Sequence, residues 1–121
     1  MTDFSTQAAE ATLRMRKLFP ATPLQRNDYL SLAYDADIWL KREDLSPVRS
    51  YKLRGAYNAM SKQMDKQVFV CASAGNHAQG VAFVCRHMCK NGVIFMPVTT
   101  PQQKISKTKL FGGGVGELHH I

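Results

Sequence analysis

One lysine stands where a side-chain amine could act as a nucleophile or a base. Lys52 lies in the stretch Lys41–Met60, KREDLSPVRSYKLRGAYNAM, after a polar segment that contains Pro47. Ser50 can begin a helix, which places Lys52 in the first helical turn, beside unpaired backbone N–H groups and the positive end of the helix dipole. A positive field and burial both lower the pKa of an amine. Lys52 is therefore a candidate catalytic amine, although a solvated lysine at a helix end fits the same residues.

A second candidate site is the segment Ser73–Gly80, SAGNHAQG, between an apolar run and a predicted helix. Open α/β sheets bind ligands at such a place, outside the carboxyl ends of their strands. Backbone N–H groups of the loop and of the helix start can bind an anion. Gly75 lets the backbone approach a ligand closely, and Asn76 offers both a donor and an acceptor. An ordinary helix cap has similar residues, so this motif has to be taken together with Lys52.

The first half of the chain contains helical patterns and one strand-like segment. Apolar spacing predicts a helix over residues 5–18, with Ser5 or Thr6 as its cap. A short helix around Asp28–Tyr34 and a β-rich segment at Asp37–Lys41 follow. The Lys52 helix should run to about Met64, with an apolar face made of Leu53, Ala56, Tyr57, Met60 and Met64.

The second half reads as strand, helix, strand, helix, which predicts an α/β fold with a parallel sheet. The predicted elements are a buried strand at Val68–Ala72, a turn at Ser73–Gly80 into a helix that runs to about Lys90 with Asn91-Gly92 as its C-terminal cap, a strand at Val93–Val98, and a helix at Gln102–Phe111. Another strand should begin near Val115, close to the last residue of the sequence. We therefore expect the chain to be the opening part of a larger protein, or a truncated form of one.

Composition excludes several classes of protein. With 121 residues and 45% hydrophobic side chains, the chain can form one small domain with a core. No apolar run approaches the ~18 residues of a membrane helix, so we expect no membrane segment. The net charge of +7 raises nucleic-acid binding as an alternative, but the basic residues are scattered and no zinc-finger, RNP or GXXG motif accompanies them. We expect no nucleic-acid partner.

The cysteines are three in number, at positions Cys71, Cys85 and Cys89. An odd count favours reduced thiols in a cytoplasmic protein over a disulfide framework. A metal site built from Cys85, His87 and Cys89, with His119 and His120, is a further alternative. One helix would place the two cysteines on one face and His87 on another, and the chain has no CxxC pair. We expect no metal.

Charged side chains are dense around Lys52, namely Arg42, Glu43, Asp44 and Arg54. We expect them to form a local ion-pair network that orients the turn before the Lys52 helix. A charged field that acts directly on Lys52 is the alternative.

Three blocks of sequence resemble one known family. KREDLSPVRSYKLRGAY, CASAGNHAQGVA and VIFMPVTTPQQKI occur in the order found in the threonine dehydratases, or threonine ammonia-lyases, and the likeness runs from about Thr22 to Gly112. The resemblance implies fold type II of the pyridoxal-phosphate enzymes, a parallel-sheet α/β sandwich of three layers, of which this chain would be the N-terminal portion. It also implies that residues 1–66 begin the large cofactor domain and residues 67–121 begin the small α/β domain.

The resemblance also implies roles for individual residues. Lys52 would form the Schiff base with pyridoxal 5′-phosphate, and its pKa would have to fall from ~10.4 for the amine to act as a base. Tyr51 would flank the cofactor ring, and Asn76 would hydrogen-bond its phenolic oxygen. The loop that holds the substrate carboxylate would consist of Ser73, Ala74, Gly75, Asn76 and His77.

The implied reaction converts L-threonine to 2-oxobutanoate and ammonia, either towards isoleucine or in threonine catabolism. The substrate would be an amino acid, L-threonine or L-serine, and the parent enzyme a homo-oligomer in the cytoplasm. A relative of the serine dehydratase or serine racemase type is one alternative, and a non-catalytic truncated product is another. The family's second glycine-rich loop, which grips the cofactor phosphate, has no counterpart here, because Gly112–Gly114 falls where the family has a helix end. We expect this chain alone to bind the cofactor weakly and to have little or no activity.

Overall fold

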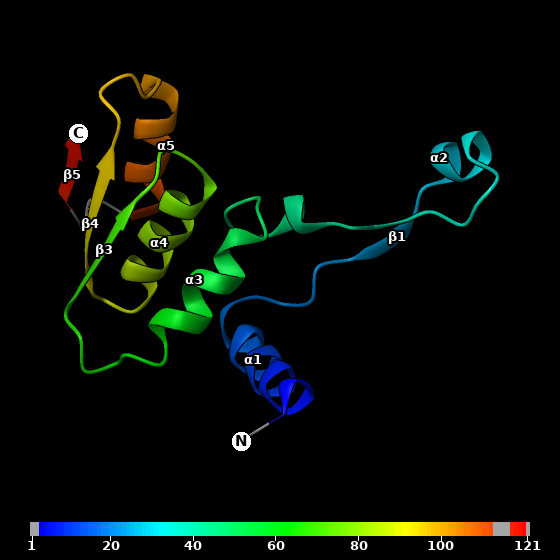
Figure 1. Ribbon diagram of the computed structural model, residues 1–121, viewed down its shortest axis with the longest axis horizontal. Helices are drawn as coiled ribbons and strands as arrows, with labels where there is room; N and C mark the ends of the chain where they lie inside the picture. The colour runs from blue at the N-terminus through cyan, green and yellow to red at the C-terminus, as the bar shows by residue number, and fades with distance from the viewer. Residues whose placement is uncertain (1–2, 113–116, 121) are drawn as a thin grey trace.

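The chain forms an N-terminal helix, a projecting arm and a small α/β unit (Figure 1). The structure is a computed structural model that describes residues 3–112 and 117–120. Its elements are α1 (Phe4–Leu18), β1 (Leu24–Arg26), α2 (Asp28–Ala33), β2 (Trp39–Lys41), a 3-10 turn (Glu43–Leu45), α3 (Lys52–Met60), β3 (Val68–Ala72), α4 (Asn76–His87), β4 (Asn91–Met96), α5 (Gln102–Gly112) and β5 (Glu117–His120).

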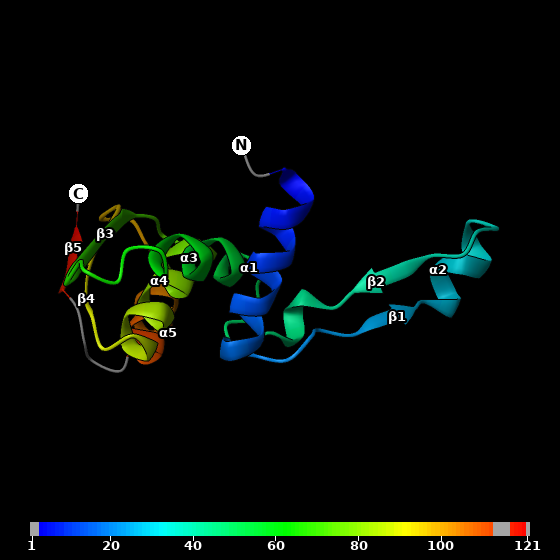
Figure 2. The same ribbon diagram turned by 90° about the horizontal axis from the view of Figure 1, so that it is seen from below.

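A parallel sheet of three strands, in the order β3-β4-β5, confirms the predicted α/β class. Val70 is in register with Val93, and Ile94 with Leu118. Both α4 and α5 lie on the same side of this sheet, so the described residues form two layers of the expected three (Figures 1 and 2). The prediction that β3 is buried was wrong, because it is an edge strand and the side chain of Val70 is 63% exposed.

The arm projects away from the α/β unit (Figure 2). It consists of β1 and β2, which pair antiparallel with Leu24 opposite Lys41, and of α2 between them. Sequence reasoning predicted α2 and β2 but missed β1, because its sequence LQR contains one apolar residue and shows no apolar run. Asn27 caps α2 by accepting the N–H of Leu30 at 2.8 Å.

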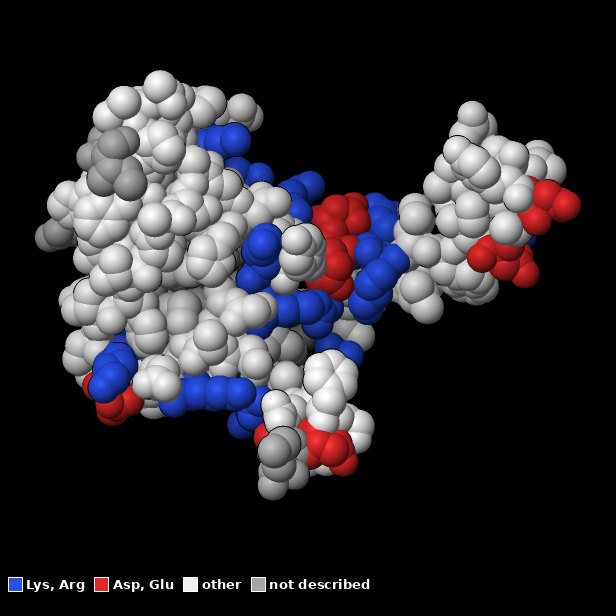
Figure 3. Space-filling model, in the orientation of Figure 1, with Lys and Arg blue, Asp and Glu red and all other residues white. Residues whose placement is uncertain are grey.

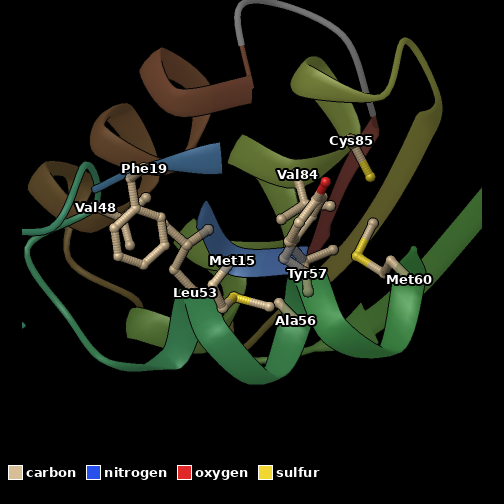
Figure 4. Close-up of a cluster of buried hydrophobic side chains, with 10 residues drawn as sticks. Met15, Phe19, Val48, Leu53, Ala56, Tyr57, Met60, Val84 and Cys85 are labelled. Atoms are coloured by element: carbon tan, nitrogen blue, oxygen red, sulfur yellow. The ribbon is translucent and has the colours of Figure 1, made fainter. Parts of the chain in front are cut away.

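The main core lies where α1, α3 and α4 meet (Figure 4). Leu53 of α3 and Val84 of α4 are fully buried, and Met15 of α1 packs into the same cluster. The helical spacing of Leu53, Ala56, Tyr57 and Met60 therefore does form one buried face, as predicted. Because this cluster draws on residues before and after residue 66, it joins the two halves of the chain, and the division into two domains stays a prediction.

Two helix boundaries differ from the predicted ones. Asp3, rather than Ser5 or Thr6, caps α1, because its carboxylate accepts both the Thr6 N–H at 2.8 Å and the Ser5 hydroxyl at 2.6 Å. At the other end of the core, α3 stops at Met60, and the following turns carry Met64 out to 59% exposure. Met64 is thus not part of the apolar face.

The end of α4 also differs from the prediction. Cys89 has φ 54°, its N–H donates to the carbonyl of Arg86, and the N–H of Lys90 donates to the carbonyl of Cys85 at 2.8 Å. This is a Schellman motif with a cysteine in the left-handed position where glycine is usual. The helix therefore ends before Asn91-Gly92, which begins β4 instead.

Candidate active site

Lys52 is the first residue of α3, as its position in the sequence predicts. Its backbone N–H donates to the Ser50 hydroxyl at 3.1 Å, so Ser50 does help to begin this helix. The side chain is exposed, and its Nζ lies 5.3 Å from the centre of the Tyr51 ring. The amine is therefore open to a ligand, with an aromatic ring beside it.

The turn that leads into α3 is held by hydrogen bonds between two serines. The Ser46 hydroxyl donates to the Ser50 carbonyl and accepts the Ser50 N–H, both at 3.0 Å. Val48 is 1% exposed and anchors the turn in the core. Arg49 has φ 57°, a left-handed conformation that is rare for residues other than glycine. Backbone strain of this kind occurs at sites whose surroundings fix it, and here it lies three residues before Lys52.

The loop at Ser73–His77 connects β3 to α4, where the predicted ligand loop should be. The Ser73 hydroxyl accepts the N–H groups of Gly75 at 3.2 Å and of Ala78 at 3.4 Å, which fixes the loop's shape. Asn76 and His77 begin the helix, and N–H groups of a first helical turn have no acceptor within the helix. A side chain placed at Gly75 would meet nothing within 4 Å, so the space over this backbone is open.

Close packing of two helices brings the two motifs together. A Cβ atom on Gly80 of α4 would lie 3.4 Å from the Cα and N atoms of Leu53 in α3. The helices thus meet next to Lys52, and a pocket of about 350 Å³ forms there. Its lining consists of Tyr51, Lys52, Arg54, Gly55, Ala56 and His77. The structure thus places His77 with Lys52 and Tyr51, whereas Ser73 and Asn76 lie outside the lining.

An ion-pair network surrounds the turn before α3, as the dense charges predicted. Arg54 donates to both carboxylate oxygens of Glu43, each at 2.8 Å, and the Thr22 hydroxyl donates to Glu43 at 2.6 Å. These hydrogen bonds, above all the one from Arg54, lower the pKa of Glu43 and raise that of Arg54. The contribution of Thr22 was not foreseen from the sequence, since nothing in the spacing links residue 22 to residue 43.

Arg42 and Asp44 form a second pair two residues apart, with bonds of 2.8 and 2.6 Å. Figure 3 shows many Lys and Arg side chains near the root of the arm, beside a smaller acidic patch. The charges around the turn therefore partly neutralise one another.

The cysteines offer no comparable chemistry. Among the side chains that the structure describes, no group of three His, Cys, Asp or Glu is placed to hold a metal ion. Cys71, Cys85 and Cys89 are free, and burial raises the pKa of Cys85 to about 11. A thiol with so high a pKa is a packing group rather than a nucleophile. No helix within the described ranges is long and apolar enough to cross a membrane.

A larger hollow, about 550 Å³, lies in the arm between α2 and β2. Its one cation, Arg26, is held by Asp28 at 2.5 Å and by Asp37 at 3.0 Å. That pairing stabilises the arm itself, so we place the candidate site at Lys52.

Comparison with known proteins shows the family of the chain. The family model described as pyridoxal-phosphate dependent enzyme matches residues 16–120, which is most of the chain and reaches beyond the expected limit near Gly112. The chain belongs to this family. Members of the pyridoxal-phosphate dependent family use an amine-reactive aldehyde cofactor, and the exposed Lys52 amine beside Tyr51 fits such a group. The pocket volume of about 350 Å³ also suits a small cofactor.

Among the pyridoxal-phosphate dependent relatives, L-threonine dehydratase biosynthetic IlvA of Bacillus subtilis is 62% identical over 96 residues, 77% of this chain and 23% of that protein. The protein of the same name from Staphylococcus aureus is 56% identical over 106 residues, 85% of this chain and 25% of that protein. The chain thus spans about a quarter of the length of these relatives.

Solved structures of this enzyme family share the fold. The processed form of threonine deaminase isoform 2 from Solanum lycopersicum superposes with a TM-score of 0.82 and 33% identity, over 99% of this chain and 34% of that one. Maize serine racemase superposes with a TM-score of 0.81 over 93% of this chain and 34% of that one, at 23% identity, which shows the fold alone. These likenesses confirm the expected fold type II architecture.

Proposed function

We propose that this chain carries the Lys52 part of a threonine dehydratase, which converts L-threonine to 2-oxobutanoate and ammonia in a cytoplasmic, homo-oligomeric enzyme. The observation that carries the proposal is the pocket that Lys52 shares with Tyr51 and His77. The relatives named threonine dehydratase, at 62% and 56% identity, support the substrate and favour the biosynthetic form of the reaction.

Tyr51 and Lys52 act on the cofactor and the substrate in this proposal. When bound, pyridoxal 5′-phosphate supplies a conjugated ring that draws electrons from the substrate's α-carbon. Tyr51 flanks that ring, and the Lys52 amine, when neutral, removes the α-proton of the substrate. The β-hydroxyl then leaves, and hydrolysis of the released product gives 2-oxobutanoate and ammonia.

The loop after β3 holds the other end of the substrate. In this proposal the loop of Ser73, Ala74, Gly75, Asn76 and His77 receives the carboxylate, and the backbone N–H groups of the first turn of α4, at Asn76 and His77, act as donors. The Ser73 hydroxyl keeps the loop in shape, and the open space at Gly75 admits the ligand. The side-chain amide of Asn76 is exposed and can hydrogen-bond the phenolic oxygen of the cofactor.

Reductive trapping tests the proposal on the chain itself. The chain is incubated with pyridoxal 5′-phosphate, reduced with borohydride and digested, and the labelled peptides are weighed. We expect the label to concentrate on Lys52, and we expect L-threonine added before reduction to decrease that label more than L-serine or D-threonine does. Lys52→Ala should abolish the preferred label while the other lysines react as before.

Two results would contradict the proposal. Label spread evenly over all the lysines would show that no cofactor site forms at Lys52. A Lys52 label that responds to L-serine but not to L-threonine would keep the cofactor site and assign the enzyme to the serine-specific relatives.

A further inference from the structure

Lys52 lies inside a loop of chain that one ion pair closes. Glu43 begins the 3-10 turn before the Lys52 helix, and Arg54 is two residues beyond Lys52 within it. Arg54 reaches back to Glu43 with two hydrogen bonds of 2.8 Å, so the chain from residue 43 to residue 54 forms a closed ring. A two-point bond between planar groups fixes orientation as well as distance.

Besides the core contacts of Val48 and Leu53, the closed ring makes polar contacts with Thr22. The Thr22 hydroxyl donates to Glu43 at 2.6 Å and accepts from Arg54 at 3.2 Å, and Thr22 is 6% exposed. The guanidinium of Arg54 also lies 5.1 Å from the ring centre of Phe19, at the end of α1. We name Thr22, Glu43 and Arg54 together the clamp.

The side chain of Lys52 has little of its own to hold it. In the described part of the chain, its Nζ makes no ion pair within 4 Å, and its ring contact is with the neighbouring Tyr51. The direction of the Lys52 side chain is therefore set by the backbone at the start of α3. That backbone is fixed from one side by the Ser46–Ser50 turn and from the other by the clamp.

We propose that Arg54 is a positioning residue for Lys52, acting through the clamp to aim the amine into the pocket it shares with His77. This inference rests on the proposed function, because it assigns Arg54 a task only if Lys52 is the reactive amine. Lysine at position 54 would keep the charge but could not make the two-point bond to Glu43. The entry of α3 would then be free to rotate, although the core beneath Leu53 would stay intact.

The reductive trapping with pyridoxal 5′-phosphate provides the test, since its readout is the share of label on Lys52 relative to the other lysines of the wild-type sequence, with label on any introduced lysine counted separately. We expect Arg54→Lys to lower this share about tenfold, because small displacements of a reacting group have large effects on rate. Labelling is done well below the thermal midpoint of each variant, as measured by circular dichroism. A merely structural role would lower the midpoint and leave the share in the folded chain unchanged.

Arg42→Lys is the matched control. Arg42 makes the same kind of two-point bond, to Asp44 at 2.8 and 2.6 Å, and it also donates to Gln25 of the arm at 2.7 Å. Neither contact closes a ring of chain that contains Lys52. We expect its Lys52 share to equal that of the wild type. Glu43→Gln removes the charged partner of Arg54 from the clamp. If Arg54→Lys does not fold, the Lys52 share of Glu43→Gln tests the positioning role instead.

Each outcome is decisive. A folded Arg54→Lys or Glu43→Gln chain that keeps the wild-type share overturns the positioning role and leaves the proposed function standing. If Arg42→Lys lowers the Lys52 share as much as Arg54→Lys does, the positioning role is also overturned, because the loss of any arginine would then have this effect. If the wild-type chain shows no preference for Lys52, the proposed function fails first and the positioning role fails with it.

Discussion

Gly80 lies against the backbone of Leu53, where an added Cβ atom would be 3.4 Å from both the Cα and the N of that residue. Leu53 follows Lys52 directly, and Gly80 is three residues beyond His77. The absence of a side chain at position 80 is thus what allows α4 to bring its ligand loop to the start of α3. Sequence reasoning missed this role, because it placed Gly80 in the turn before the helix, whereas α4 already begins at Asn76.

The first prediction concerns this close approach. Gly80→Val places two methyl groups against backbone atoms that cannot move aside, so we expect the free energy of unfolding to fall by about 1–3 kcal/mol. Urea denaturation followed by circular dichroism measures the change. Gly55→Ala is the control, because a Cβ there meets nothing within 4 Å, and we expect it to stabilise α3 by about 0.5–1 kcal/mol. A Gly80→Val chain as stable as the wild type would show that the helices separate without cost.

The second prediction concerns the end of α4. Cys89 has φ 54°, so Cys89→Gly should relieve a left-handed conformation and raise the free energy of unfolding by about 1 kcal/mol. Cys89→Ala keeps the side-chain strain and should leave stability nearly unchanged. The two variants are compared by thermal unfolding under reducing conditions. Equal midpoints for the two would argue against the Schellman geometry.

The third prediction follows from the lowered pKa of Glu43. Its ordinary pKa is 4.5, and the hydrogen bonds from Arg54 and Thr22 hold the folded-state pKa below that value. The ionised carboxylate therefore stabilises the fold above pH 4.5, and this contribution is lost as the pH falls through the lower, folded-state pKa. We expect the difference in unfolding free energy between the wild type and Glu43→Gln to be largest near neutral pH and to shrink towards about pH 3.

Glu10→Gln is the control for this pH dependence. Glu10 meets Arg14 at 3.9 Å and is exposed, and such surface pairs contribute little to stability. Urea titrations of the three chains at both pH values measure the differences. A Glu43→Gln difference that does not change with pH would mean that charge plays no part in the clamp.

The fourth prediction concerns the ligand loop. Ser73→Ala removes the hydroxyl that accepts the N–H groups of Gly75 and Ala78, and we expect a loss of about 1 kcal/mol in unfolding free energy. Ser73→Thr retains the hydroxyl and should retain most of that stability. Amide hydrogen exchange at Gly75 and Ala78 reports on the same contacts directly. Unchanged exchange in Ser73→Ala would show that the hydroxyl does not hold the loop.

Local sequence was enough wherever a local pattern decides the structure. The spacing of Leu53, Ala56, Tyr57 and Met60 predicted the buried face of α3, and the alternation of apolar runs and helices predicted the parallel sheet. The position of Lys52 at a helix start also followed from its neighbours. The cap at Asp3 and the helix end at Cys89 were missed, because several nearby residues competed for each role.

By itself the sequence determined the helices and every strand except β1, the place of Lys52 in its helix and the family to which the chain belongs. Only the tertiary structure decided that His77 lies with Lys52, that Thr22 joins Glu43 and Arg54, and that Gly80 sets the distance between the two helices. The physical reason is that periodicity and capping depend on residues a few positions apart, whereas these contacts join segments far apart in the chain. Such contacts follow from how the faces of α1, α3 and α4 pack into one core.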